Sequence, residues 1–344
     1  MGLFSSETNT IGIDVGSSAV RVVQLKKTAN KPSLVAFGMA QLPKNIAQSD
    51  SRLDQQKVAH IIKQVVKSAN VSTKNVVASL PGSAVFTTVV KLPPMNSREL
   101  PQAVRYQAEQ NIPLKIEEVK IDWQVIRENP TTKELAVMIV AATKSKVDRL
   151  VELFDMAELN VEYLETTSIS TARALATPTD PLVMLVDIGE ISTELTIVEN
   201  GIVTHTRSLP SAGLALTRVI AKNLGLDEVQ AEQFKRKFGL SQDKLEGQVF
   251  KTMKPVLNNV TDEIERSIKF YQEQYGGLVQ KIVLTGGGAY LMEIISYLKS
   301  IFNIEVVYGN AWANINYQPN VADRLNQNSL EFACAVGLAM RETL

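Results

Sequence analysis

The stretch IGIDVGSSAVRVVQL, residues 11–25, decides the fold that we expect for this chain. Its apolar residues alternate as in a buried strand, an acid stands at Asp14, and the chain turns at Gly16-Ser17-Ser18 before a second alternating strand. The hairpin tip exposes backbone N–H groups and two hydroxyls, which suit a phosphate, and Asp14 suits a hydrated Mg²⁺ beside it. An ordinary hairpin with a surface acid has the same pattern, so this stretch alone leaves both interpretations open.

A second stretch, LVMLVDIGEISTELTIV at 182–198, repeats this pattern. It contains an apolar strand, an acid, a glycine, two hydroxyls and another alternating strand, formed around Asp187, Gly189, Ser192 and Thr193. Asp14 and Asp187 are 173 positions apart, about half of the 344 residues. A repeat at this spacing predicts two similar lobes that face each other. Because two facing loops can hold one polyphosphate–metal unit, the repeat favours the phosphate interpretation.

A run of three glycines lies further along the chain. Residues 281–284 form an apolar strand that leads directly into Gly286-Gly287-Gly288, ahead of a predicted helix. Glycines between a strand and a helix N-terminus let a flat or charged ligand approach the backbone. A flexible turn is the alternative, and the two hairpins favour the ligand. Helices are predicted within 211–275, between the second hairpin and this loop.

The composition excludes several classes of function. The formal net charge is zero and the basic residues form no dense cluster with aromatic ones, so we expect no nucleic acid partner. The single Cys334 excludes an internal disulfide and suits a reducing compartment. His60 and His205 are far apart in the sequence, which argues against a zinc site. No run approaches the roughly 18 apolar residues of a membrane span, so we expect a cytoplasmic protein.

Residues 83–159 have a pattern of their own and are predicted to form an inserted subdomain. Asn96 and Glu99 are spaced as in a capping box at the start of a helix. The economical arrangement is a small two-layer αβ module, with strands at 85–92, 119–127 and 134–142 and helices at 96–111 and 145–159. The remainder then divides into a first lobe, 1–82 and 160–180, and a second lobe, 181–344.

These pieces, in this order, resemble the actin-like ATPase superfamily. DVGSSAVR (14–21) and DIGEIST (187–193) are similar to its two phosphate loops, LTGGGA (284–289) to its adenosine loop and AEQFKRKFG (231–239) to its AExxK helix. Within the superfamily, IPLKIEEVKID (112–122), the Gly2-Leu3-Phe4 start and the VGLAMR ending at Arg341 resemble the PilM family of type IV pilus assembly. The resemblance implies an α/β, two-lobed, duplicated ribonuclease H-like fold with an inserted αβ subdomain of the FtsA/PilM type.

The resemblance also implies roles for individual residues around ATP or ADP. Asp14 and Asp187 would hold Mg²⁺, largely through water. Gly16, Ser17, Ser18 and Arg21 would contact the β- and γ-phosphates, with Gly189, Ser192 and Thr193 opposite them. Glu232 and Lys235 would border ribose and adenine, Gly213 would lie near the α-phosphate, and Gly286, Gly287 and Gly288 would pass under the nucleotide.

Two departures from the superfamily pattern bear on catalysis. Ala212-Gly213 stands where a pair of glycines is expected, which weakens the expected contact with the α-phosphate. Glu165 is near the position of an acid that polarises water, but Thr166-Thr167-Ser168 follows it instead of a small-residue and proline pattern. In-line attack needs a positioned water, so we expect at most slow ATP hydrolysis, with Glu165 as the catalytic candidate.

The function implied by the resemblance is that of a cytoplasmic ATP-binding scaffold, peripheral to the inner membrane. It would bind the N-terminal cytoplasmic peptide of PilN and so link the PilN/PilO membrane complex to the pilus motor that drives twitching motility. The inserted subdomain is the candidate peptide site, and self-association is left open.

A polymerising ATPase of division or cell shape, similar to FtsA or MreB, is the alternative function. A polymer would need exposed apolar loops in the second lobe, which the sequence does not show clearly. An FtsA-like protein would carry a C-terminal amphipathic helix after a linker, and we expect none after the helix that contains Cys334. A sugar-kinase relative would need a further catalytic acid in the cleft, and no additional Asp motif indicates one.

Overall fold

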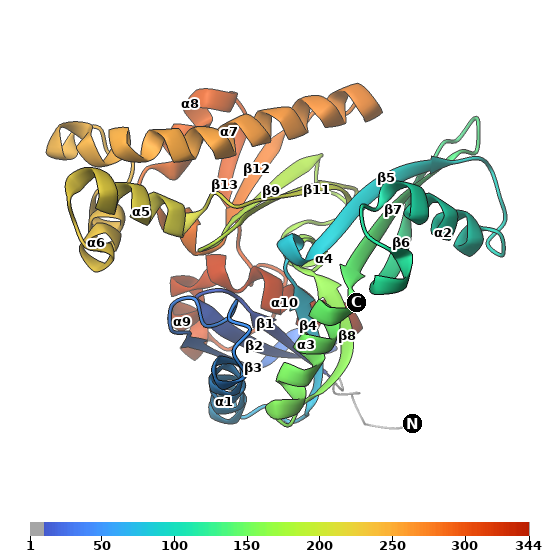
Figure 1. Ribbon diagram of the computed structural model, residues 1–344, viewed down its shortest axis with the longest axis horizontal. Helices are drawn as coiled ribbons and strands as arrows, with labels where there is room; N and C mark the ends of the chain where they lie inside the picture. The colour runs from blue at the N-terminus through green and yellow to red at the C-terminus, as the bar shows by residue number, and fades with distance from the viewer. Residues whose placement is uncertain (1–9, 344) are drawn as a thin grey trace.

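Two five-stranded sheets with the same strand order form the centre of the molecule (Figure 1). The structure, a computed structural model, describes residues 10–343. The Gly2–Phe4 segment and the first nine residues of the predicted first lobe therefore lie outside the described residues. In each sheet three antiparallel strands are followed by two strands parallel to the first, which confirms the duplicated two-lobed architecture predicted from the repeated hairpins.

The first sheet has the order β3-β2-β1-β4-β8 and lies between two helical layers. The alternating residues of β1 and β2 send Ile13 and Val22 toward α1 and α3 on one face, and Val23 toward α10 on the other. The elements are β1 (Ile11–Val15), β2 (Ala19–Lys26), β3 (Ser33–Gln41), α1 (Arg52–Ala69), β4 (Asn75–Leu80), α3 (Lys144–Met156), β8 (Asn160–Thr166) and α4 (Thr167–Leu175).

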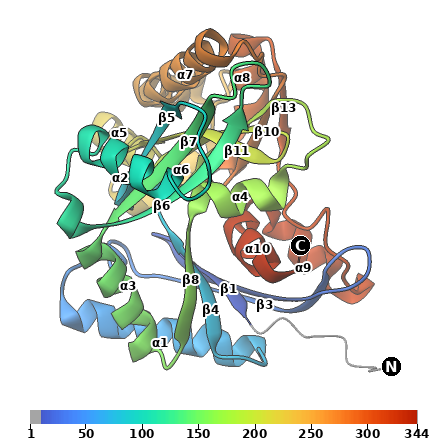
Figure 2. The same ribbon diagram turned by 90° about the vertical axis from the view of Figure 1, so that its right-hand side faces the viewer.

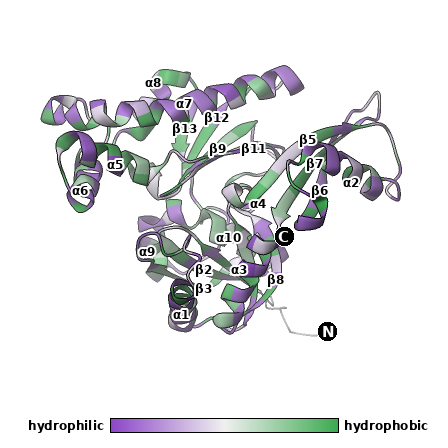
Figure 3. Cartoon of the chain, viewed as in Figure 1, coloured by the Kyte–Doolittle hydropathy of each residue, from purple (hydrophilic) through white to green (hydrophobic). Residues whose placement is uncertain are grey.

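The second sheet has the order β11-β10-β9-β12-β13 and is covered on one face by the long helix α7. Met184 and Val186 of β9 pack into this core with Met253 and Ile264 of α7. Figure 3 shows hydrophobic residues in the strands of this lobe and hydrophilic ones along α7. The elements are β9 (Val183–Ile188), β10 (Thr193–Glu199), β11 (Ile202–Leu209), α5 (Gly213–Leu224), α6 (Glu228–Phe238), α7 (Gln248–Tyr275), β12 (Lys281–Thr285), α8 (Ile294–Phe302) and β13 (Glu305–Tyr308).

A three-stranded antiparallel sheet of order β5-β7-β6 lies between β4 and α3 in the sequence. Its elements are β5 (Val85–Leu92), α2 (Leu100–Asn111), β6 (Val119–Glu128) and β7 (Leu135–Thr143). Asn96 and Glu99 form the reciprocal hydrogen bonds of the predicted capping box. One face of the sheet packs on α2, whereas the other contacts α4 and the second lobe through Met138 and Val203 (Figures 1 and 2). We call 83–159 the insertion, and its boundaries stay a prediction.

After β13 the chain returns to the first lobe and ends there in α9 (Ala322–Gln327) and α10 (Ala333–Ala339). The predicted assignment of all of 181–344 to the second lobe is therefore wrong at its C-terminal end. The physical reason is that ACAVGLA of α10 is apolar on every side, so it is buried between β1 and α4 (Figure 2). Gly337 permits this packing, because a Cβ there would lie 1.7 Å from the carbonyl oxygen of Ser170.

Within residues 10–343, no helix combines the length and the apolar character that crossing a membrane requires.

His205 of β11 is buried against Phe270 of α7, with ring centroids 5.1 Å apart. Desolvation and the nearby charge of Arg207 lower its pKa from 6.5 to about 4, although Glu263 of α7 acts in the opposite direction. The unfolded chain therefore binds more protons between these two values. The stability contribution of the neutral imidazole is complete above pH 6.5 and is lost as the pH falls toward 4.

We expect the free energy of unfolding to fall by about 2 kcal/mol at a pH of about 5 because of His205 alone. Urea unfolding of the wild type and His205→Gln at this pH and at about 7.5 measures the effect, since the difference between the two proteins isolates this residue. His60→Gln is the matched control, because His60 is exposed. Equal pH dependence in the wild type and His205→Gln would contradict the prediction.

Candidate functional site

The two repeated hairpins have the same turn geometry. The N–H of Gly16 donates to the carbonyl of Ala19 at 3.0 Å, and the N–H of Gly189 donates to the carbonyl of Ser192 at 3.0 Å. The strand registers also agree, because Asp14 pairs with Arg21 and Asp187 pairs with Glu194. The equivalent positions therefore carry a cation in the first lobe and a carboxylate in the second.

The carboxylates of the two hairpins lie close to one another. Desolvation, followed by the charges of Glu194 and Asp14, raises the pKa of Asp187 to about 7, against the lowering effect of Arg21. Asp14 is buried and accepts a hydrogen bond from Ser79 Oγ at 2.8 Å. The structure thus brings the predicted metal ligands Asp14 and Asp187 together across the two lobes.

Arg21 is buried at the base of the first hairpin and is bound to two carboxylates. Its Nη1 lies 3.5 Å from Asp14 Oδ2, and its Nη2 forms an ion pair with Glu331. Burial would lower the pKa of Arg21, but the charges of Asp14 and Glu331 raise it instead. Its Nε has no hydrogen-bond partner among the described residues. The predicted contact of Arg21 with phosphate stays a prediction.

The residues predicted to border the ribose, the adenine and the α-phosphate form one network with the second hairpin. The N–H of Gly213, at the start of α5, donates to the carbonyl of Gly189 at 3.1 Å, and Lys235 Nζ donates to the carbonyl of Gly213 at 2.9 Å. Lys235 also pairs with Glu232 at 2.7 Å. Burial would raise the pKa of Glu232, but hydrogen bonds from Lys235 and Thr217 lower it to about 2. Burial lowers the pKa of Lys235, although its bond to Glu232 acts in the opposite direction.

The triple-glycine loop closes on the second hairpin. Gly286 has a φ of +83°, and a Cβ at this residue would lie 2.2 Å from Asp187 Oδ1. At Gly288 a Cβ would lie 2.3 Å from the side chain of Ile188. The N–H of Gly286 donates to the carbonyl of Leu330 at 2.8 Å, directly before Glu331. The other three predicted motifs therefore all approach the second hairpin.

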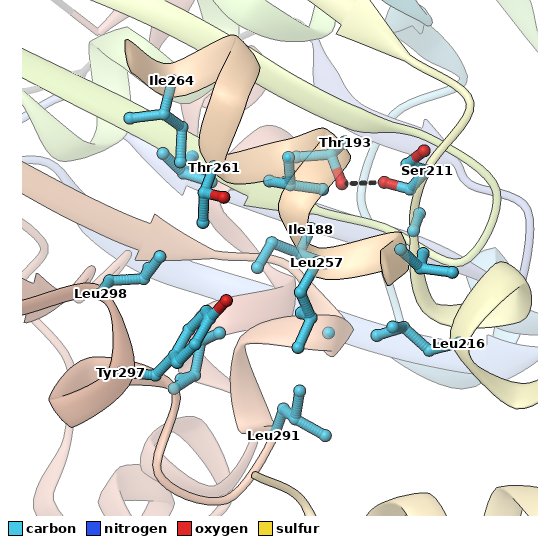
Figure 4. A pocket seen from close by; sticks show the side chains of 16 residues that line it. Ile188, Thr193, Ser211, Leu216, Leu257, Thr261, Ile264, Leu291, Tyr297 and Leu298 are labelled. Atoms are coloured by element: carbon cyan, nitrogen blue, oxygen red, sulfur yellow. Dashed lines mark hydrogen bonds between the residues drawn. The ribbon is translucent and has the colours of Figure 1, made fainter. Parts of the chain in front are cut away.

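Two predicted site residues have their side chains engaged elsewhere. Thr193 Oγ1 donates to the carbonyl of Ser211 at 2.6 Å, beside an apolar cavity of about 20 Å³ inside the second lobe (Figure 4). The buried carboxylate of Glu165 accepts hydrogen bonds from Arg173 at 2.6 and 2.9 Å and also pairs with Arg341. This cluster ties β8 to α4 and to the C-terminal turn, so a structural role explains Glu165, and its catalytic role stays a prediction.

Glu194 is a residue of the site that we did not predict. Its Oε1 accepts from the N–H of Gly82 at 2.6 Å, and its Oε2 accepts from Thr167 Oγ1. Desolvation raises its pKa, although these two donors act in the opposite direction. The signal that could have found it is the repeat itself, since Glu194 follows Asp187 by the seven positions that separate Arg21 from Asp14.

Glu194 also lines a cavity of about 370 Å³. It separates β5 of the insertion from β11 of the second lobe, which are edge strands of their sheets among the described residues. Its lining mixes apolar residues such as Phe86 and Ile191 with polar ones such as Ser83, Thr87 and Arg207. At the far end of β10, Arg127 of the insertion pairs with Glu199. This ion pair joins the insertion to the second lobe.

Comparison with known proteins reveals several similar proteins. A solved PilM-PilN type IV pilus biogenesis complex contains a chain with a TM-score of 0.85 and 26% identity, covering 98% of this chain and 100% of that one. MreB5 of Spiroplasma citri bound to AMPPNP has a TM-score of 0.56 and 14% identity over 98% and 97%. These similarities confirm the predicted actin-like fold.

Sequence comparison agrees with this result. The cell division protein FtsA of Neisseria meningitidis serogroup B is 24% identical over 199 residues, covering 50% of this chain and 47% of that relative, about half its length. The family described as type IV pilus assembly protein PilM matches residues 12–343. This chain therefore belongs to the PilM family of type IV pilus assembly proteins.

Proposed function

We propose that this chain is an ATP- or ADP-binding scaffold that connects the inner-membrane complex of the type IV pilus to its cytoplasmic motor. The observation that carries the nucleotide part is the convergence of both hairpins, the Glu232–Lys235 pair and the triple-glycine loop between the lobes. Solved MreB5 structures with AMPPNP and with ADP support this proposal, because they share the fold.

Asp14 and Asp187 are the residues that would hold Mg²⁺ in this proposal. Hard divalent cations prefer carboxylate and water oxygens. Burial first, and then the neighbouring carboxylates, raise the pKa of Asp187, and a cation would stabilise the charged form of these acids. Bound Mg²⁺ would offset the charge of the phosphates. With Glu165 held by Arg173 and Arg341, no free acid is available there to polarise water, which fits slow hydrolysis at most.

The cytoplasmic N-terminal peptide of PilN is the proposed partner. The solved PilM-PilN complex supports this proposal, because it pairs a similar chain with PilN. We place this peptide in the cavity between β5 and β11, because edge strands offer unpaired backbone groups to an extended segment. Binding there would hold the protein at the inner membrane through PilN and PilO, as a cytoplasmic component of twitching motility. Self-association remains outside this proposal.

A synthetic peptide of the PilN N-terminal segment from the same genome should shift the amide signals of β5 and of its boundary with the lobes. Thr87→Arg fills the cavity and should weaken binding at least tenfold, about 1.4 kcal/mol. Tyr106→Ala alters the exposed outer side of α2 and should bind normally. Shifts confined to parts of the second lobe outside β10 and β11 would contradict the proposed placement, and no binding would contradict the partner.

A further inference from the structure

We propose that Glu194 is a positioning residue that transmits the state of the second phosphate hairpin to the start of the insertion. This inference rests on the proposed function, because it describes how the nucleotide site would act on the peptide site. The sequence motifs do not indicate this role, because Glu194 lies outside the loops that resemble known nucleotide-binding loops.

The contacts of Glu194 join three parts of the molecule. The residue lies at the beginning of β10, in register with Asp187, two residues after Ser192 of the hairpin turn. Its carboxylate binds the N–H of Gly82, three residues before β5, and the hydroxyl of Thr167, the first residue of α4. A displacement of the hairpin therefore reaches both the first strand of the insertion and the helix beneath it.

The link is short and has little freedom to absorb movement. Glu194 is 9% exposed, and a Cβ at Gly82 would lie 2.8 Å from its Oε1. A buried carboxylate that loses its donors is strongly unfavourable, so the donors should follow the carboxylate when it moves. This makes the contact suitable for transmission, unlike an exposed ion pair that water can replace.

Glu194 also stands in the wall between the two proposed sites. Together with Gly82 and Ser192 it lines the 370 Å³ cavity of the proposed peptide site. On its other side its charge acts on Asp187, which faces Asp14 in the proposed nucleotide site. One side chain is thus shared by two sites whose ligands would not touch each other, which is the arrangement that energetic coupling requires.

The first hairpin carries the counterpart of this link. Arg21, at the equivalent register position, pairs with Glu331 in the C-terminal segment. Each copy of the repeat therefore uses the same position to bind a segment that lies outside its own hairpin. The cation of the first lobe binds the segment beside the triple-glycine loop, whereas the carboxylate of the second lobe binds the start of the insertion.

Hydrogen–deuterium exchange of the full chain, with and without Mg·AMPPNP, tests the inference without the peptide. We expect the nucleotide to change exchange in residues 82–92 of the wild type and of Glu199→Gln, a matched acid on the same strand that pairs with the insertion. In Glu194→Gln this change should be lost. In Thr167→Val, which removes one of the two donors of Glu194 and leaves the bond from Gly82, it should be reduced, while Mg·AMPPNP should bind within about threefold of the wild type.

A peptide titration gives a second readout, which a merely structural role would not move. Saturating Mg·AMPPNP should alter the PilN-peptide affinity of the wild type by at least about fivefold, and that of Thr167→Val by less than about twofold. The inference is overturned if Glu194→Gln and Thr167→Val keep the wild-type coupling between nucleotide and peptide. It is also overturned if Glu199→Gln loses as much of this coupling as they do, even when both ligands bind. If calorimetry shows that the wild type binds no nucleotide, the proposed function fails first and this inference fails with it.

Discussion

Replacing Asp14 with alanine is expected to abolish measurable Mg·ATP binding, a loss of at least about 100-fold in affinity, or roughly 3 kcal/mol. Asp14 and Asp187 are the two proposed metal ligands and approach each other across the lobes, so removing Asp14 takes away half of the proposed cation site. The remaining Asp187 would then face the phosphates without a paired ligand for Mg²⁺. Isothermal titration calorimetry with Mg·ATP measures the effect.

Two controls separate binding from folding in this experiment. Asp14→Asn retains an acceptor for the Ser79 hydroxyl but lacks the charge, so it should also lose Mg·ATP while its thermal unfolding stays close to that of the wild type. Asp54→Ala removes an acid of α1 that lies in the first lobe away from the cleft, and it should bind normally. Unchanged nucleotide affinity in Asp14→Ala would contradict the proposal that Asp14 holds Mg²⁺ beside the nucleotide.

Gly337→Ala is expected to lower the free energy of unfolding by about 3 kcal/mol or more. The added Cβ would lie 1.7 Å from the carbonyl oxygen of Ser170, a backbone atom that cannot rotate away, so α10 and α4 would have to separate. Because α10 also packs against β1, the separation would expose apolar surface on two sides. Urea unfolding measures the loss.

Gly287→Ala is the matched control for this substitution. A Cβ at Gly287 meets its nearest neighbour, Glu331, at 3.8 Å, which is ordinary van der Waals contact. Its unfolding free energy should stay within about 1 kcal/mol of the wild type. A loss below about 1 kcal/mol in Gly337→Ala would show that α10 shifts at little cost and would refute the close packing as a determinant of stability.

Strands that are buried on both faces, or on one face only, could be predicted from the sequence. The first kind appears as a continuous apolar run and the second as alternating apolar and polar residues. β5 occupies the predicted residues 85–92. β8 and β11 were missed, since they are edge strands whose exposed positions carry polar residues such as Glu162 and Arg207. The return of α10 to the first lobe was also missed, because an apolar segment does not specify which sheet it covers.

The glycine and acid motifs of the site could be predicted, but the partners of its charged groups could not. Glu194 and Gly82 are 112 positions apart, and Arg21 and Glu331 are 310 apart. No local pattern encodes such pairs. The same limit explains Glu165, whose residue type suits catalysis but whose carboxylate is held by two arginines that only the fold brings near.

The return of the chain from β13 to the first lobe means that the lobes are joined by two covalent crossings, after α4 and after β13. These crossings touch, because a Cβ at Gly309 would lie 2.9 Å from Leu175 at the end of α4. A pair of adjacent connections behaves mechanically as a single pivot, so the halves can swing about it without stretching either connection. The molecule is in this respect a clamp with one hinge, and in the proposed function the nucleotide between the two halves would set how far they close.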